Sequence, residues 1–303
     1  MAGLILGSCG SPNPTGPPAD EPGPRPLLVP IIAAAGDISC APAMRASCVQ
    51  GATAEVIRQI APHAVLALGD NQYDSGELEN YLAAYQPTWG LFKAVTRPVA
   101  GNHEYQMSRA RGYYDYFNGP GVATGAAGDR ERGYYSFDLG AWHFIALNSN
   151  CRDIGGCHVG SPQEFWLRLD LQASDARCTL AYFHHPLFAS GPNGNTPQVR
   201  PLWQALYDFN ADVVLSGHEH LYERYVPQTP QGVLDPERGI RQFVVGTGGH
   251  SLTRFVTVQP NSEVRSNEAF GVLKMALASN GYTWDFRPVA GSHFTDFGSA
   301  SCH

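Results

Sequence analysis

The hydrophobic positions along the chain follow two spacings from about Pro30 onward. Short unbroken apolar runs, such as residues 30–35 and 64–68, are typical of strands that are buried on both faces. Segments with helical spacing lie between such runs, at residues 54–60, 76–86, 161–174 and 199–210. The third of these opens with a capping box formed by Ser161 and Glu164. Alternating strands and helices predict parallel strands joined by crossover helices.

The remaining apolar runs indicate further strands. Residues 132–150 are predicted to form a hairpin that turns at Leu139 and Gly140. Single strands are predicted at residues 97–104, 178–186 and 211–220, and successive antiparallel strands at 239–249, 270–279 and 281–288. We find no internal repeat and no second linker. The pattern therefore predicts one α/β domain over residues 29–303, a four-layer α/β/β/α sandwich of two mixed β-sheets flanked by helices.

Residues 1–28 have a different composition. Leu6, Gly7 and Ser8 precede Cys9, an arrangement that resembles the bacterial lipoprotein signal and makes Cys9 a candidate for lipidation. A Pro/Gly-rich spacer that would act as an extended tether follows. The apolar region before Cys9 is only about three residues long, against the usual 7–15, so we interpret the start as a truncated signal. The alternative is a tail with an unrelated cysteine.

Composition narrows the functional classes. Apolar residues make up 43% of the chain, which is enough for a sizeable core, and no run approaches the length of a membrane span. The formal net charge is -7 and no Lys/Arg-rich run occurs, so we expect no nucleic-acid partner.

Cysteine usage agrees with export. Local spacing favours the pairs Cys40–Cys48 and Cys151–Cys157, and Cys178–Cys302 would then attach the C-terminal segment. Six free thiols are the alternative. Because disulfides persist in oxidising compartments, the pairs predict a secreted or extracytoplasmic protein, with or without a lipid anchor.

Five predicted strands end in residue types that bind metals. Each such motif is weak alone, because Gly-Asp after a strand is usually a turn. In α/β sheets, however, ligands bind at the carboxyl ends of strands, so five such ends predict one shared site. The residues are Asp37, then Asp70 with Tyr73, then Asn102 with His103, then His184 with His185, and finally His218 with His220.

This series resembles the calcineurin-like metallophosphoesterase superfamily. The resemblance runs from Asp37 to His220, and Tyr73, three residues after Asp70, points to the purple acid phosphatase branch. The resemblance implies two metal ions about 3.5–4 Å apart with Asp70 as the anion between them. It also implies the remaining ligands: Asp37, Tyr73 and His220 for the first metal, and Asn102, His184 and His218 for the second.

The first motif departs from most of the superfamily. It has Ser39 where a metal-binding histidine is common, which fits Tyr73 as the replacement ligand. A phenol ionises near pH 10, so a phenolate at neutral pH needs a strong Lewis acid. We therefore expect Fe(III) at the Tyr73 site and a divalent ion (Zn, Mn or Fe) at the other. The alternative is that Tyr73 only packs and leaves the first site weak.

Three other histidines are candidates for substrate contact. The resemblance implies that His103 binds the phosphoryl group or protonates the leaving group, with Glu104 orienting it; a structural histidine is the alternative. His185 is a substrate-binding candidate, although successive residues on a strand face opposite ways and favour its leaving the site. His250 lies on a Gly-rich loop and is either a substrate-binding residue or a solvated one.

These observations predict a binuclear metal-dependent phosphatase. It would hydrolyse phosphomonoesters by attack of a metal-bound hydroxide, with His103 assisting the leaving group. A phosphodiesterase or nucleotidase is the nearest alternative, because substrate choice belongs to the loops near residues 105–132, 150–160 and 186–200. An exported, non-catalytic iron-binding protein is the alternative from another class. The expected partner is a small phosphate ester.

Overall fold

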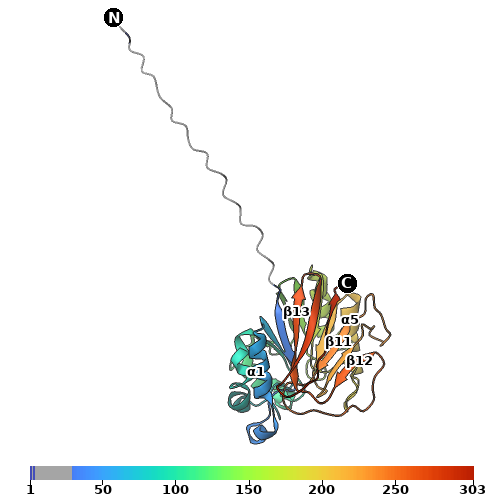
Figure 1. Ribbon diagram of the computed structural model, residues 1–303. Coiled ribbons are helices and arrows are strands. Elements are labelled where there is room, and N and C mark those ends of the chain that lie inside the picture. Colours follow the sequence, from blue (N-terminus) through green and yellow to red (C-terminus); the bar gives the residue numbers. More distant parts are fainter. Residues whose placement is uncertain (2, 4–28) are drawn as a thin grey trace.

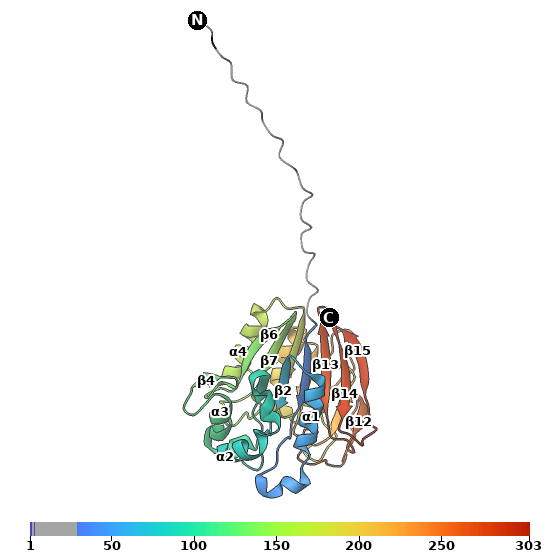
Figure 2. The ribbon, with the colours of Figure 1, turned by 60° about the vertical axis from the view of Figure 1, so that its left-hand side comes forward.

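The structure is a computed structural model that describes Met1, Gly3 and residues 29–303. The lipidation candidate Cys9 lies outside the described residues. Two β-sheets pack face to face and helices cover their outer sides (Figures 1 and 2). The predicted four-layer α/β/β/α arrangement is confirmed.

The first sheet has six strands in the order β15-β14-β13-β1-β2-β3. Strands β1, β2 and β3 are parallel, so their carboxyl ends lie at one edge, and β13, β14 and β15 add to β1 in antiparallel pairs. The bounds are β1 Ile31–Ala35, β2 Ala64–Leu68, β3 Thr96–Val99, β13 Gly271–Ala278, β14 Gly281–Pro288 and β15 Phe297–Ser301.

The second sheet has seven strands in the order β12-β10-β11-β9-β8-β7-β6. Strands β7, β8, β9 and β11 are parallel neighbours, and β6, β10 and β12 pair antiparallel. The bounds are β6 Tyr135–Leu139, β7 Trp142–Ala146, β8 Cys178–Tyr182, β9 Val213–Ser216, β10 Tyr222–Tyr225, β11 Arg241–Val245 and β12 Ser262–Ser266. A small ribbon joins β4 Thr124–Gly125 and β5 Gly128–Asp129.

One strand prediction is wrong. The segment around β11 was expected to begin a run of antiparallel strands, but β11 pairs in parallel with β9 and lies in a different sheet from the β13–β14 hairpin. The apolar pattern of a fully buried strand is the same in either sheet, so sequence spacing cannot assign its neighbours.

Two hydrophobic cores explain the unbroken apolar runs. Along β8, Leu180 and Tyr182 face the core between the sheets. Ala181, and Phe183 just after the strand, face the core beneath the helices α4 Pro162–Ala173 and α5 Arg200–Asp208. Because successive strand residues point to opposite faces, both faces of β8 must be apolar. Helix α1 Gln50–Ile60 covers the other sheet with its own apolar face (Figure 2).

The predicted helix at 76–86 takes a different form. Only α2 Leu78–Asn80 is a short α-helical turn, and Tyr81–Tyr85 continues as a π-helix. The wider turn buries the Tyr81 and Tyr85 rings against Tyr116, at centroid distances of 4.8 and 5.6 Å. Tyr116 belongs to α3 Arg111–Phe117, a helix that apolar spacing did not predict because its buried face is mostly tyrosine.

The capping box of α4 is present with a small shift. The Ser161 hydroxyl accepts the N–H of Glu164, as expected, but the Glu164 carboxylate accepts the N–H of Gly160 at 2.9 Å and not that of Ser161. Both contacts satisfy N–H groups at the start of the helix.

Three disulfides fasten the domain. They join Cys40 to Cys48 and Cys151 to Cys157, the pairs that local spacing favours, and Cys178 to Cys302, the pair expected from the two cysteines that remain. The last bond connects β8 of the seven-stranded sheet to the segment after β15 of the six-stranded one. Among the described helices, none has the length and apolar character to cross a bilayer.

Candidate metal centre

The five predicted strand ends meet at one edge of the sandwich. The polar residues that follow β1, β2 and β3 come from one sheet, and those that follow β8 and β9 come from the other. A hydrogen bond connects the two sheets at this edge. Nδ1–H of His184, which follows β8, donates to the carbonyl oxygen of Leu68 at the end of β2 (2.9 Å). That bond fixes the tautomer of His184 and leaves the Nε2 lone pair for the site.

One group of donors gathers around the Tyr73 hydroxyl. It lies 2.9 Å from Oδ1 of Asp37 and 3.0 Å from Nε2 of His220. Nε2 of His220 is itself 3.2 Å from Asp37 Oδ1, and its Nδ1 is 2.7 Å from the Ser251 hydroxyl. A phenol oxygen, a carboxylate and an imidazole therefore face a common point.

A second group gathers around His184. Its Nε2 lies 3.1 Å from Oδ1 of Asn102 and 3.3 Å from Nδ1 of His218. The amide oxygen comes from the turn after β3, and the two imidazoles come from the turns after β8 and β9. The donors of this set are therefore one amide oxygen and two imidazoles.

Asp70 joins the two groups. Its Oδ2 lies 3.1 Å from the Tyr73 hydroxyl and 3.2 Å from His184 Nε2, so a single oxygen reaches both sets. Its Oδ1 accepts the backbone N–H of His103 at 2.9 Å, which orients the carboxylate. The side chain is buried, and so is Asp37.

The backbone is unusual at three of these positions. Asp37, Asp70 and His218 have φ values of 60°, 47° and 68°, in the left-handed region that non-glycine residues rarely occupy. The glycines beside the ligands make room for the site. A Cβ on Gly69 would overlap the His184 ring, and one on Gly101 would overlap the Asp70 carboxylate. The Gly-Asp and Gly-Asn motifs therefore have glycine where the backbone lies too close to a candidate ligand to leave room for a side chain.

The charges of the two groups depend on one another. Burial alone would raise the pKa of Asp70, but the nearby His184 and His103 outweigh it and hold that pKa below its usual value. Burial works against charge on His184 too, yet Asp70 raises its pKa to about 9. Burial and the positive His184 lower the pKa of His218 to about 4. The second group thus offers at least one neutral imidazole.

Tyr73 is held as a phenol by its surroundings. Burial, followed by the carboxylates of Asp37 and Asp70, raises its pKa well above 10. Its ring lies between two imidazoles, with His250 stacked at 3.8 Å between centroids and His103 tilted at 4.3 Å. His250 therefore contacts a candidate ligand and is not a freely solvated loop residue. Only a strongly polarising cation would remove the proton from this phenol.

Comparisons with known proteins decide the family. The model of the calcineurin-like phosphoesterase family matches residues 32–222, which is more than half of the chain. The chain belongs to the calcineurin-like phosphoesterase family. The matched span includes every predicted metal ligand.

The curated relatives of this phosphoesterase-family chain include purple acid phosphatases of Arabidopsis thaliana. Purple acid phosphatase 23 is 30% identical over 185 residues, covering 55% of this chain and 38% of the relative. Purple acid phosphatase 21 is 29% identical over 214 residues, covering 63% and 47%. The chain thus spans less than half the length of these relatives.

A solved structure has the same fold. Purple acid phosphatase PPD1 from yellow lupin seeds superposes with a TM-score of 0.71 at 21% identity, over 90% of this chain and 54% of that one. The family implies two metal ions. The two donor groups that share Asp70 fit that requirement, because carboxylate, phenol, amide oxygen and imidazole are all metal-binding groups.

Glu104 makes different contacts from the one predicted. Its carboxylate was expected to orient His103, but it accepts N–H groups from Asp70 (3.0 Å), Gly101 (2.7 Å) and Asn71 (2.8 Å). Gln72 N–H and the Tyr81 hydroxyl donate to it as well. The side chain is fully buried, and burial together with Asp70 raises its pKa to about 7. Glu104 therefore ties the loop after β2 to the loop after β3.

The expectation that His185 leaves the site is wrong. Its ring lies 4.4 Å from the ring of His218 and 4.9 Å from that of His184. Strand β8 ends at Tyr182, so the alternation of a strand does not extend to these residues. The structure leaves His185 a substrate-binding candidate.

The His218–His220 pair also lies beyond the end of its strand, so its conformation differs from the predicted one. An extended segment was expected, but β9 ends at Ser216 and His218 lies in a turn with positive φ. The two imidazoles still face the two donor groups, one each. Between them, Glu219 is buried away from the centre, and its Oε1 accepts the N–H of Gly194 at 2.8 Å.

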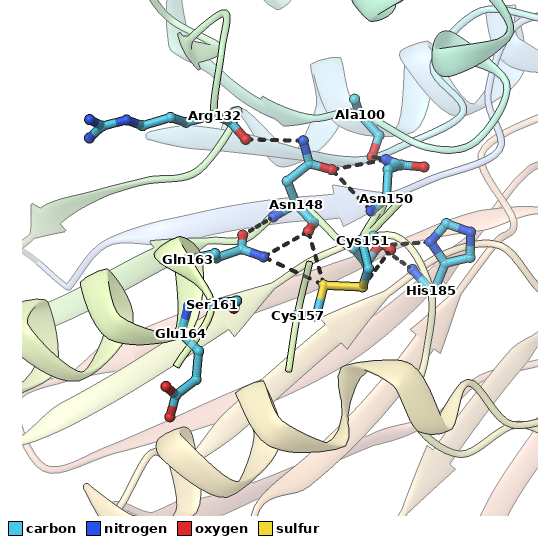
Figure 3. Close-up of a disulfide and its surroundings, with 11 residues drawn as sticks. Ala100, Arg132, Asn148, Asn150, Cys151, Cys157, Ser161, Gln163, Glu164 and His185 are labelled. Atoms are coloured by element: carbon cyan, nitrogen blue, oxygen red, sulfur yellow. Dashed lines mark hydrogen bonds between the residues drawn. A yellow bond between two sulfur atoms is a disulfide. The ribbon is translucent and has the colours of Figure 1, made fainter. Parts of the chain in front are cut away.

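A sixth strand end adds residues that motif analysis missed. Asn148, Ser149 and Asn150 follow β7 and are buried. Figure 3 shows Asn148 and Asn150 with their hydrogen-bond partners. Nδ2 of Asn150 donates to the carbonyl oxygen of Ala100 (3.1 Å), just before Gly101 and Asn102, and the Ser149 hydroxyl contacts His185. The signal was available, because a polar run directly after an apolar strand is the pattern that marked the other five ends.

Proposed function

We propose that this chain is a binuclear metal-dependent phosphatase that hydrolyses phosphomonoesters. The observation that carries the proposal is the position of Asp70 Oδ2, within 3.2 Å of both the Tyr73 hydroxyl and His184 Nε2. A carboxylate oxygen shared by two donor sets is the arrangement that a pair of metals requires. A carrier of a single iron ion would need no such shared oxygen.

The ligands divide by their contacts. Asp37, Tyr73 and His220 would hold one metal, and Asn102, His184 and His218 the other, with Asp70 between them. We assign Fe(III) to the Tyr73 side, because burial and two carboxylates raise the pKa of this phenol and oppose its ionisation. A divalent ion (Zn, Mn or Fe) suits the second group, whose donors other than Asp70 are neutral when the imidazoles act as ligands.

The reaction would be a direct hydrolysis with His103 as the proton donor. When bound, the metals neutralise the phosphoryl charge and lower the pKa of a water molecule. His103 Nδ1 contacts the carbonyl oxygen of Asp74, so an N–H there leaves Nε2 facing the centre. With 28% of its side chain exposed, His103 can reach a bound ester. As the imidazolium it carries a proton on each nitrogen, and it would give the Nε2 proton to the departing oxygen.

The setting that we propose for this reaction is outside the cytoplasm. The three disulfides are typical of proteins from oxidising compartments. We further propose that residues 29–303 act as one catalytic domain, because the core between the sheets contains side chains from β1 through β14.

One preparation of the protein tests the proposal in three ways. Elemental analysis should give two metals per chain, one of them iron. The visible spectrum should show a phenolate-to-iron band that Tyr73→Phe abolishes. An aryl phosphomonoester should be turned over faster than a diester, and His103→Ala should lower kcat by about 10²- to 10⁴-fold.

His293→Ala is the matched control, because this histidine is exposed on the loop before β15. It should keep both the colour and the rate. A Tyr73→Phe variant with unchanged colour would remove the assignment of Fe(III) to the Tyr73 side. Faster turnover of a diester would favour a phosphodiesterase, and a single metal without turnover would favour an iron-binding protein.

A further inference from the structure

Ser149 and His185 form a pair held by two hydrogen bonds. The backbone N–H of His185 donates to the Ser149 hydroxyl oxygen at 3.0 Å, and that oxygen also lies 2.8 Å from His185 Nδ1. Ser149 follows β7 and His185 follows β8, so the pair links two neighbouring strand ends.

The hydrogen bonds of the Ser149 hydroxyl determine which nitrogen of His185 carries the proton. The Ser149 oxygen already accepts one N–H, and its side chain is buried. If His185 Nδ1 were protonated, the Ser149 O–H would have no acceptor among the described residues, which costs about 1–3 kcal/mol for a buried group. If Ser149 O–H donates to Nδ1, every group is satisfied. His185 then carries its proton on Nε2.

The pair lies beside the second donor group. A ring nitrogen of each of His184, His185 and His218 falls within 4.8 Å of the others. His185 is partly exposed, whereas His184 is fully buried. Because Nδ1 is bound to Ser149, an Nε2–H is the donor that this ring can offer beside the second donor group, and a donor is what a phosphoryl oxygen needs.

The support for the pair is rigid. On one side of Ser149, the backbone N–H of Asn148 donates to Oε1 of Gln163 in α4 (2.7 Å), and Nε2 of Gln163 donates to the backbone carbonyl of Asn148 (2.9 Å). Asn150 on the other side donates to the Ala100 carbonyl, and the Cys151–Cys157 disulfide closes the loop that follows (Figure 3). A donor fixed in this way needs little reorganisation when an anion arrives.

We propose that Ser149 and His185 act together as a phosphate-binding pair. His185 donates Nε2–H to a phosphoryl oxygen on the His184–His218 side of the centre, and Ser149 is the positioning residue that sets its tautomer. The inference rests on the proposed phosphatase function and adds two substrate-contacting or positioning residues to it. Ser149 acts only through His185.

The test uses inorganic phosphate as the probe and the metal-loaded protein. Phosphate affinity is measured by calorimetry, and metal content and thermal midpoint are measured on the same samples. We expect His185→Ala to weaken phosphate binding by about 10- to 100-fold, the range for a hydrogen bond to a charged group. Both metals should remain bound.

Ser149 is tested by two substitutions. Ser149→Ala should weaken phosphate binding by about three- to tenfold, because His185 can then carry its proton on either nitrogen. Ser149→Thr keeps the hydroxyl and should restore most of the affinity. A merely structural role would lower the thermal midpoint of Ser149→Ala without lowering the affinity of the folded protein for phosphate. His293→Ala should behave as the wild type.

Each outcome decides a different point. Loss of one metal in His185→Ala would make His185 a metal ligand and overturn its role as a donor. Unchanged phosphate affinity in His185→Ala, with an active wild type, would overturn the inference and leave the phosphatase standing. A wild type that binds two metals but neither binds phosphate nor turns over an ester would overturn the proposed function as well.

Discussion

A single carboxylate sets the relative position of the loops that carry the candidate ligands. Glu104 is fully buried and accepts backbone N–H groups from both the Asp70 loop and the Gly101 turn. Glu104 is not itself a candidate metal ligand, yet Asp70 cannot reach both donor groups unless these loops stay together. Residues behind a site can therefore matter as much as those in it.

Glu104→Gln should lower the free energy of unfolding by about 2–3 kcal/mol. An amide NH₂ would replace one acceptor oxygen and face N–H donors, which leaves buried polar groups unpaired. Urea denaturation measures the change. Glu79→Gln is the control, because Glu79 is exposed on α2, and it should change stability by less than about 0.5 kcal/mol. Equal effects of the two substitutions would contradict the role given to Glu104.

At the scale of elements, His143 connects two strands and a helix at the end of the sandwich that lies away from the candidate metal centre. His143 at the start of β7 lies 2.8 Å from Asp138 of β6 and 2.9 Å from Asp170 of α4. Because both ring nitrogens face carboxylates, the imidazolium is the form that satisfies them. Burial opposes the charge, but the bonds to Asp170 and Asp138 outweigh it and raise the pKa of His143 above 6.5.

This contact predicts a pH-dependent part of the stability. A raised pKa in the folded state means that the stabilisation is complete below pH 6.5 and is lost as the pH rises through the folded-state value. We expect the wild type to lose about 1 kcal/mol more than His143→Gln between about pH 6 and pH 9. The amount is small because Asp138 is largely exposed. Parallel pH profiles in urea denaturation would contradict the prediction.

At the scale of the whole molecule, one covalent bond connects the two sheets. Cys178 belongs to β8 and Cys302 follows β15, at a sequence separation of 124. The Cys151–Cys157 bond, in contrast, spans 6 positions within one loop. In the chain-entropy description, a longer closed loop restricts the unfolded state more.

Removal of the two bonds should therefore have unequal effects. Cys178→Ala with Cys302→Ala should cost on the order of 4 kcal/mol, and Cys151→Ala with Cys157→Ala about 2 kcal/mol. Guanidinium denaturation of the two double variants beside the wild type gives both values. A larger loss for the short loop would show that native contacts around Ser149, and not loop closure, dominate the stabilisation.

The sequence by itself determined the strand ends and the chemistry gathered at them. Apolar runs fix where a buried strand begins and stops, and a polar residue at its exit is a local feature. Parallel strands share an edge, so Asp37, Asp70 and Asn102 could be brought together without coordinates. The four-layer arrangement followed from the same pattern.

Only the tertiary structure decided how chain segments that are distant in sequence meet beyond the strand ends. The turns after β8 and β9 leave the extended conformation, so the direction of His185 and His218 could not follow from alternation. Glu104 takes its role from the backbone N–H of Asp70, 34 residues away, and Ser149 takes its role from His185, 36 residues away. Such contacts depend on the packing of loops, which apolar spacing does not encode.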